Sequence, residues 1–226
     1  MKLSIKSMMF ATMAFSAVAA NAVVFTDATG DFGAPMNTYG NPNFDVSSLE
    51  ITNDLTNIVF KFTVNNANIT SPDWHKFFVL LNDGTGPTSG SNGWGRNIAL
   101  AGGATAWMGG WVDGGGGGQG FTYNGAWNNN NGVTIALSGS TATYTASLSS
   151  LGLSIGDTFT FDAGTTGNNG DHGAWDLVSL ATPSAAGPTD FVTSNSNLQY
   201  SVVPEPATMT AMAMGAAALL RRRKKA

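Results

Sequence analysis

Two tryptophans in the stretch ATAWMGGWVD are spaced so that their side chains share one face of an extended strand. Trp107 and Trp111 lie four residues apart, and Gly109 lies between them on the same face. At ~3.3 Å per residue their Cα atoms would be about 13 Å apart, with a gap between the rings above the glycine. Indole rings stack on the apolar C–H face of a sugar, so this spacing predicts two platforms along a glycan. The alternative is that both rings are structural and belong to the core.

Two more tryptophans in loop-rich sequence complete the candidate carbohydrate-binding group. Trp94 precedes the pair and Trp127 follows it. The glycine run at residues 114–118 is expected to form a mobile loop beside the rings. The asparagine run at residues 128–131 offers hydrogen bonds to sugar hydroxyls, or otherwise forms an ordinary polar loop.

Three aspartates are candidate ligands for a metal ion. Asp27, Asp31 and Asp176 lie beside strand-like segments at the two ends of the domain, which a β-sandwich often brings together. Carboxylate oxygens suit Ca²⁺, so a structural calcium ion held by these residues is one hypothesis. The sequence contains no D-x-D-x-D-G loop, and the alternative is that these are ordinary turn residues.

Motifs of hydrolytic and nucleotide-dependent enzymes are absent from the sequence. There is no G-x-S-x-G, no H-E-x-x-H and no P-loop. The two histidines are His75 and His172, and His172 in its loop is either a base or metal ligand or a solvated turn residue. A glycosidase would need two carboxylates at a set separation, for which Asp162, Asp171 and Asp176 are candidates. We expect no catalysis.

The elements that must position these residues are short strands. In residues 58–64 the side chains of Ile58, Phe60, Phe62 and Val64 point one way, and Lys61 points the other way. This pattern predicts a half-buried strand.

Similar signals recur along the chain. The apolar run at residues 76–81 predicts a strand buried on both faces. Further strands are expected at residues 46–52, 132–139, 141–148, 157–163, 174–180 and 198–203, with a hairpin turn at Gly139-Ser140 and a helical turn at residues 149–153. This order predicts an all-β fold: a single antiparallel, jelly-roll-like β-sandwich domain over residues 23–202.

The charge of this domain excludes one class of partner. The chain has a net charge of −4, but between its two ends only Lys61, Lys76 and Arg96 oppose thirteen Asp and Glu residues. Nucleic-acid binding needs clustered Lys and Arg, so we expect no nucleic-acid partner. The chain contains no cysteine, which excludes disulfides, thiolate zinc sites and a cysteine nucleophile.

The first 22 residues have the pattern of a secretory signal peptide. Lys2 and Lys6 form a positive start, residues 8–18 are apolar, and Ala20-Asn21-Ala22 supplies a small-x-small cleavage site. We therefore expect Sec-type export and cleavage after Ala22 by signal peptidase.

The last residues combine a break, an apolar run and a basic block. Pro204 and Pro206 interrupt strand or helix formation, and residues 207–220 carry no charge. As a helix this run would span roughly 21 Å, short of the ~30 Å hydrocarbon core, so we expect a transient transmembrane stage. The basic block that follows fits the positive-inside rule and consists of Arg221, Arg222, Arg223, Lys224 and Lys225.

Residues 203–226 resemble the PEP-CTERM sorting signal of Gram-negative bacteria. The resemblance rests on Pro204-Glu205-Pro206, the apolar run and the arginine cluster. It implies export across the inner membrane, recognition by an exosortase-type membrane protease, and release to or attachment at the cell surface. Proteins with this signal usually accompany exopolysaccharide production. The run here is shorter and richer in Met and Ala than the Leu-rich runs that are common.

The order of the central segments is similar to that of family 9 carbohydrate-binding modules and DOMON-like sandwiches. The similar segments run from DATGDFG through Trp74 and FFVLLND to AWDLVSL, over most of residues 25–202. The resemblance implies a β-sandwich that binds a sugar between aromatic rings, often with structural Ca²⁺. We therefore expect an exported, surface-sorted, non-catalytic protein that binds or organises extracellular polysaccharide. The alternatives are a secreted polysaccharide-active hydrolase and a purely structural matrix protein.

Both terminal signals predict processing. The mature protein should begin at Val23, because cleavage follows Ala22, and should lack the arginine cluster, because the short tail is a substrate for a membrane protease. Intact-mass measurement on protein isolated from the cell surface checks both ends. A mass that includes residues 221–225 would contradict C-terminal cleavage.

Overall fold

The computed structural model describes residues 22–31, 45–66, 69, 76–168, 172–180, 189–195 and 198–204. These residues belong to one compact unit, residues 20–205. They form strands and two single-turn 3₁₀-helices, which confirms the all-β prediction. Within this described part, no helix has the length and apolar character that crossing a membrane requires. The predicted signal peptide and the apolar run at residues 207–220 lie outside it.

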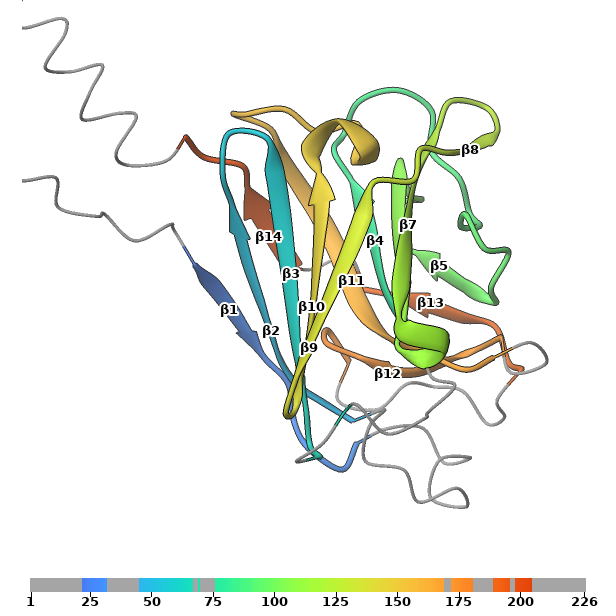
Figure 1. Cartoon of the computed structure of the whole chain (residues 1–226). Helices are drawn as coiled ribbons and strands as arrows, with labels where there is room; N and C mark the ends of the chain where they lie inside the picture. Colours follow the sequence, from blue (N-terminus) through green and yellow to red (C-terminus); the bar gives the residue numbers. More distant parts are fainter. Residues whose placement is uncertain are drawn as a thin grey trace, which may run out of the picture. The chain divides into compact units, whose positions relative to one another are not determined.

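Most of the strands form one large, curled antiparallel sheet of 12 strands (Figure 1). Its path is β1 (Val23–Thr26), β2 (Val46–Asn53), β3 (Asn57–Val64), β10 (Thr141–Ser147), β9 (Val133–Ser138), β7 (Gly117–Tyr123), β6 (Ala106–Trp111), β4 (Lys76–Asn82), β11 (Thr158–Thr166) and β12 (Ala174–Leu177). β8 (Trp127–Asn129) pairs with β7, and β14 (Leu198–Ser201) pairs with β11. β5 (Ile98–Leu100) and β13 (Val192–Ser194) form a separate parallel pair.

The curl of the sheet makes the two layers of a β-sandwich. β7 and β9 meet at a single residue pair, Gly118 and Val133, so the sheet divides there into two halves. The far edges of the two halves return to each other. Phe25 on β1 packs edge-on against Phe161 on β11, with ring centroids 5.0 Å apart. The predicted antiparallel sandwich is confirmed, and both of its layers come from one continuous sheet.

The main core lies between these two layers. The alternation in β3 is as predicted, since Phe60 and Phe62 are fully buried and Lys61 is not. Phe62 packs against Phe77 of β4, with ring centroids 4.9 Å apart, and both contact the core residue Tyr144 of β10. Because the two layers contact each other through large rings, this core depends on non-local contacts.

β4 separates the main core from a second core. Phe77, Val79 and Leu81 face the main core, while Phe78 and Leu80 face the second. The predicted strand with two buried faces is therefore confirmed. The second core lies on the outer side of the sheet and also contains Ile98, Leu100, Trp107, Phe121, Leu177 and Val192.

One side chain ties the end of the domain to β2. Asn53 accepts hydrogen bonds from the Tyr200 hydroxyl at 2.8 Å and from the Val203 backbone N–H at 3.2 Å. Its Nδ2 donates to the Val203 carbonyl at 2.7 Å. The folded domain therefore holds the chain up to the residue before Pro204.

The glycine run expected to be a mobile loop is partly regular structure. Residues Asp113–Gly115 form a 3₁₀-helix, and Gly117 and Gly118 begin β7. The loop prediction was wrong there because glycine strands lack the apolar alternation that marks a strand. The asparagine run also contributes its first two residues to β8. The predicted helical turn is present as a 3₁₀-helix at Leu148–Leu151, and Gly152 ends it with a left-handed φ of 70°.

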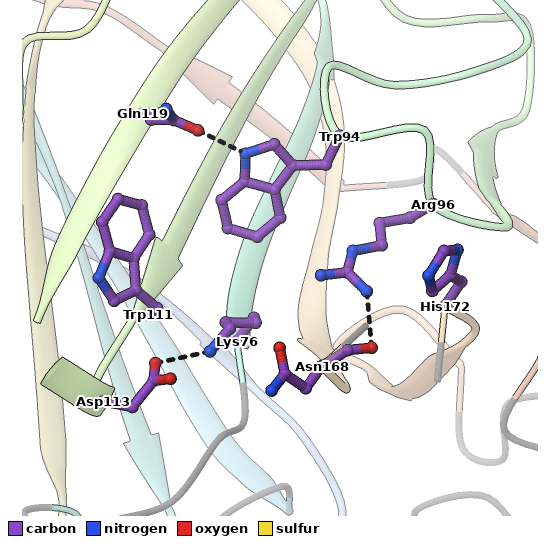
Figure 2. A pocket seen from close by; sticks show the side chains of 8 residues that line it. All are labelled: Lys76, Trp94, Arg96, Trp111, Asp113, Gln119, Asn168 and His172. Carbon is purple, nitrogen blue, oxygen red and sulfur yellow. Dashed lines mark hydrogen bonds and ion pairs between the residues drawn. The ribbon is translucent and has the colours of Figure 1, made fainter. Parts of the chain in front are cut away.

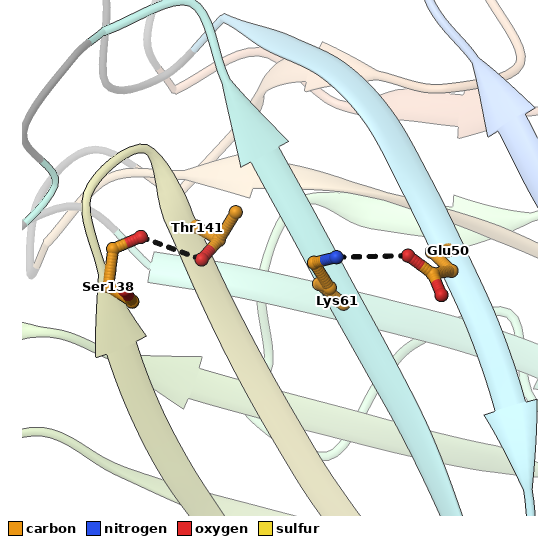
Figure 3. A network of polar contacts seen from close by, with 4 residues as sticks. All are labelled: Glu50, Lys61, Ser138 and Thr141. Atoms are coloured by element: carbon orange, nitrogen blue, oxygen red, sulfur yellow. Dashed lines mark hydrogen bonds and ion pairs between the residues drawn. The ribbon is translucent and has the colours of Figure 1, made fainter.

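The alternation in β3 predicts unequal effects of two neighbouring substitutions. Phe60→Ala should lower the free energy of unfolding by ~3–5 kcal/mol, through lost burial and a cavity. Lys61 lies on the outer face and pairs with Glu50 across the strands at 3.0 Å, partly exposed to water (Figure 3). Lys61→Ala should therefore cost less than ~1 kcal/mol. Denaturant unfolding measures both, and equal costs would contradict this orientation of β3.

Candidate functional site

Glycines on β6 and β7 allow two indole rings to lie directly against the backbone. A Cβ atom on Gly109 would collide with the Trp94 ring, and one on Gly117 would collide with the Trp111 ring. Trp111 ends β6 and pairs with Gly117 of β7 across the strands. The two rings therefore rest on the outer face of this strand pair, where a larger residue would displace them.

Trp94 and Trp111 form the aromatic part of a pocket (Figure 2). Their ring centroids lie 6.3 Å apart, with an angle of 43° between the planes. Both are half-buried, so part of each ring remains open to solvent. The Trp94 indole N–H donates to Oε1 of Gln119 on β7 at 2.8 Å, which fixes the orientation of this ring.

Trp107 is a core residue and does not form the predicted platform. It is fully buried and stacks on Phe78 at 5.2 Å, with 6° between the rings. Trp94 covers it from outside, at 5.7 Å between centroids. The predicted gap over Gly109 is filled by Trp94, so the structural alternative holds for Trp107. The residues that lie together at the surface are Trp94 and Trp111.

Trp127 lies apart from the pocket-lining residues. On β8, it packs against Tyr123 with ring centroids 5.2 Å apart, and its indole N–H donates to Ser91 Oγ at 3.1 Å. Trp127 is not among the described residues that line the pocket. The four predicted tryptophans therefore divide into a pocket pair, a fully buried core residue, and Trp127, which is partly buried against the second core.

The loop that carries Trp94 and Arg96 is shaped by one buried asparagine. Asn92 is 2% exposed, and its Oδ1 accepts from the backbone N–H groups of Trp94 and Arg96 at 3.2 and 3.0 Å. Its Nδ2 donates to the carbonyls of Arg96 and Ile98 at 2.9 and 2.7 Å. This loop is therefore anchored to the second core through β5.

The polar side of the pocket contains two basic residues, Lys76 and Arg96, which the sequence did not indicate as site residues. The pocket has a volume of about 500 Å³. Lys76 Nζ pairs with Asp113 Oδ1 at 2.6 Å. Arg96 Nη1 donates to the Asn168 carbonyl at 3.1 Å, and its guanidinium lies 5.6 Å from the centre of the Trp94 ring. The scarcity of basic residues could have indicated this site, since Lys76 and Arg96 are two of the three basic residues between the terminal segments.

The three predicted metal-ligand aspartates are brought together by the fold. One carboxylate oxygen from each of Asp27, Asp31 and Asp176 lies within 4.8 Å of the others. Asp176 is fully buried and accepts from the Val46 N–H at 2.6 Å. Asp27 Oδ2 and both Asp31 oxygens are buried without a hydrogen-bond partner among the described residues. Asp45 supports the turn between them by accepting twice from the Gly30 N–H, at 3.0 and 2.9 Å.

Burial and mutual repulsion change the protonation of this cluster. Burial, with a contribution from the negative charge of Asp31, raises the pKa of Asp27 to about 7. Burial also raises the pKa of Asp31 and holds the pKa of Asp176 well above its ordinary value. The cluster therefore needs either protons or a cation to offset its negative charge.

The candidate catalytic residues do not converge on the pocket. Asp162 is fully buried and accepts from the Ser179 hydroxyl at 2.5 Å, and burial raises its pKa to about 6. Asp162 and Asp176 are not among the described pocket-lining residues, whereas His172 is. Asp171 and His75 lie outside the described residues.

A family model identifies the function of the C-terminal segment. Residues 202–224 match the PEP-CTERM protein-sorting motif. The motif marks an exported protein that is sorted to the cell surface via the membrane, and implies a partner of the exosortase type that recognises and cleaves it. Of its predicted residues, Pro204 is described, while Glu205, Pro206 and the arginine cluster lie beyond the described part.

No curated protein matches the chain. At the other end, Ala22 is exposed directly before β1, and Ala20 lies outside the described residues.

Proposed function

We propose that this exported, surface-sorted protein is a non-catalytic module that binds extracellular polysaccharide in the Trp94–Trp111 pocket. One observation carries the proposal: two half-buried indole rings lie 6.3 Å apart in a pocket of about 500 Å³. Such a volume falls within the usual range for small-ligand sites, about 300–1,000 Å³. In this proposal, Sec-type machinery exports the chain and signal peptidase removes residues 1–22.

The rings are held in place before a ligand arrives. Trp94 is fixed by the Gln119 hydrogen bond, and Trp111 by close packing on Gly117. A ligand that stacks on them loses little of its binding free energy to ordering of the protein. Apolar C–H groups of a pyranose ring would contact the indoles, while its hydroxyls would hydrogen-bond with the polar side of the pocket.

The make-up of the pocket favours binding over hydrolysis. Glycosidases place two carboxyl groups on either side of the scissile bond. Among the described residues, Asp113 is the one carboxylate that lines the pocket, and it is paired with Lys76. The partly open rings favour a ligand-binding role over that of a matrix protein without a small ligand.

The proposal predicts that binding and stability respond separately at Trp111. Trp111→Ala should weaken glycan binding about tenfold or more, if the ring contributes ~1–3 kcal/mol as in aromatic stacking on nucleic-acid bases. The melting temperature should change little, because the ring is half-buried at the surface. The matched control is Trp107→Ala, which should lower stability by ~3–5 kcal/mol because Trp107 is in the core.

A glycan array on residues 23–203 identifies the best-bound oligosaccharide, and calorimetry with that probe then measures both variants alongside thermal melts. Unchanged affinity in folded Trp111→Ala protein would refute this site. An array with no bound glycan would refute the proposed function.

We also propose that Asp27, Asp31 and Asp176 hold a structural Ca²⁺ ion. The buried carboxylate oxygens without partners support it, since an unpaired buried charge is costly. All three donors are hard oxygens, and Ca²⁺ binds oxygen ligands at about 2.3–2.6 Å, so ligands on opposite sides of the ion lie about 5 Å apart. The 4.8 Å limit on the oxygen separations agrees with this spacing. The ion would connect the turn after β1 to β12.

Calcium should therefore raise the melting temperature, as any ligand of the native state does. Asp31→Asn should abolish the increase, while Asp190→Asn, at an exposed position, should retain it. The pH dependence in EDTA follows from Asp27. Its pKa is about 7 in the folded protein and 3.8 in the unfolded chain, so the folded state binds its proton more tightly. Asp27 therefore adds to the free energy of unfolding in acid, and this contribution is lost as the pH rises through about 7. The calcium effect should be largest above that pH. Thermal melts with and without Ca²⁺ check this, and an equal increase in Asp31→Asn would contradict the site.

A further inference from the structure

We infer that the Trp94–Trp111 pocket selects an acidic sugar, a uronate residue within an anionic polysaccharide, with the carboxylate directed to Arg96 and Lys76. This inference rests on the proposed polysaccharide binding and specifies its ligand class. It begins from where the positive charges of the domain lie.

Positive charge is concentrated at this pocket although the domain is acidic. Between the two terminal segments the chain has three basic residues against thirteen acidic ones. The third basic residue, Lys61, pairs with Glu50 on the outer face of β3. The charged side chains of the described lining residues are those of Lys76, Arg96 and Asp113, so two positive groups face one negative group.

Both cations are desolvated, which strengthens their interaction with an anion. Lys76 is 8% exposed and Arg96 is 9% exposed. Charges interact more strongly where water is excluded, so a carboxylate that enters here gains more than it would at the open surface. Lys76 already pairs with Asp113, and Arg96 donates to the Asn168 carbonyl, so a sugar carboxylate would add to these contacts.

The cations and the indole rings lie close enough for one sugar residue to contact both. The Arg96 guanidinium lies 5.6 Å from the centre of the Trp94 ring, and the Trp111 ring is 6.3 Å from the Trp94 ring. Figure 2 shows the Trp94 ring between Trp111 on one side and Arg96 on the other, with Lys76 below the Trp94 ring. A pyranose stacked on an indole would therefore direct an equatorial carboxylate toward a planar guanidinium, which hydrogen-bonds carboxylates well.

The test compares acidic oligosaccharides with neutral copies of themselves. Hexamers of galacturonate and of mannuronate are titrated into residues 23–203 by calorimetry, each beside its carboxyl-reduced counterpart. We expect at least one acid hexamer to bind about tenfold or more tightly than its reduced form, because reduction removes the charge-assisted hydrogen bonds. Its affinity should fall when NaCl is raised from about 0.05 M to about 0.5 M, while that of the reduced form should not.

Two charge variants should act in opposite directions. Arg96→Gln should remove the preference for the acid hexamer, and Asp113→Asn should tighten acid binding severalfold and raise the ratio of acid to reduced-form affinity. Lys61→Gln removes one positive charge outside the pocket and is the matched control, for which both affinities should stay within about twofold. If Arg96→Gln does not fold, the Asp113→Asn result and the salt dependence still test whether the pocket selects an acidic sugar.

Equal binding of acid and reduced hexamers, with loss of both in Trp111→Ala, would overturn the acidic-sugar inference and leave polysaccharide binding intact. Weaker acid binding in Asp113→Asn would also overturn it. Binding of neither form, together with a glycan array without hits, would refute the proposed function itself.

Discussion

The outer pocket and the inner core both depend on aromatic rings that lie directly on glycine backbone in β6 and β7. On the outer face Trp94 covers Gly109 and Trp111 covers Gly117, and on the inner face Tyr144 covers Gly110. A side chain at any of these glycines would occupy the space of a ring. Only the backbone of this strand pair separates the pocket rings from the core rings, so a shift of the strands would move both.

Glycine also determines where the sheet divides. A Cβ atom on Gly118 would press on Val133, the one residue of β9 that pairs with β7. Because the strand ladder joins the two halves at this one pair, closure of the sandwich also relies on the core and on contacts at the far edges. These include the Asn53 bonds to Tyr200 and Val203, and the bond from the Val46 N–H to Asp176. The aspartate cluster lies at this closure, so its charge state is coupled to the folding of the whole domain.

Much of the fold follows from the sequence, for reasons visible in individual strands. β3, β9, β10 and β11 carry alternating apolar residues because one face meets the core and the other meets solvent or a thin cover. β4 carries a continuous apolar run because it separates two cores. The sequence did not predict β7, because its first residues are glycines that leave room for the indole rings and show no apolar alternation. It did not predict β5 and β13, because three residues are too few to establish a period.

The site was only half predictable, because strand alternation indicates which residues share a face but not what covers that face. Trp107 and Trp111 do share the outer face of β6, yet Phe78 and Trp94 enclose Trp107 and leave Trp111 at the edge. Trp94 and Arg96 lie on a loop shaped by local hydrogen bonds of Asn92, but the packing of this loop over β6 and β7 is a tertiary feature that no local pattern encodes. The rarity of basic residues does carry information. Lys76 and Arg96 are both buried beside the indole rings, so the positions of the scarce basic residues of the domain point to this pocket.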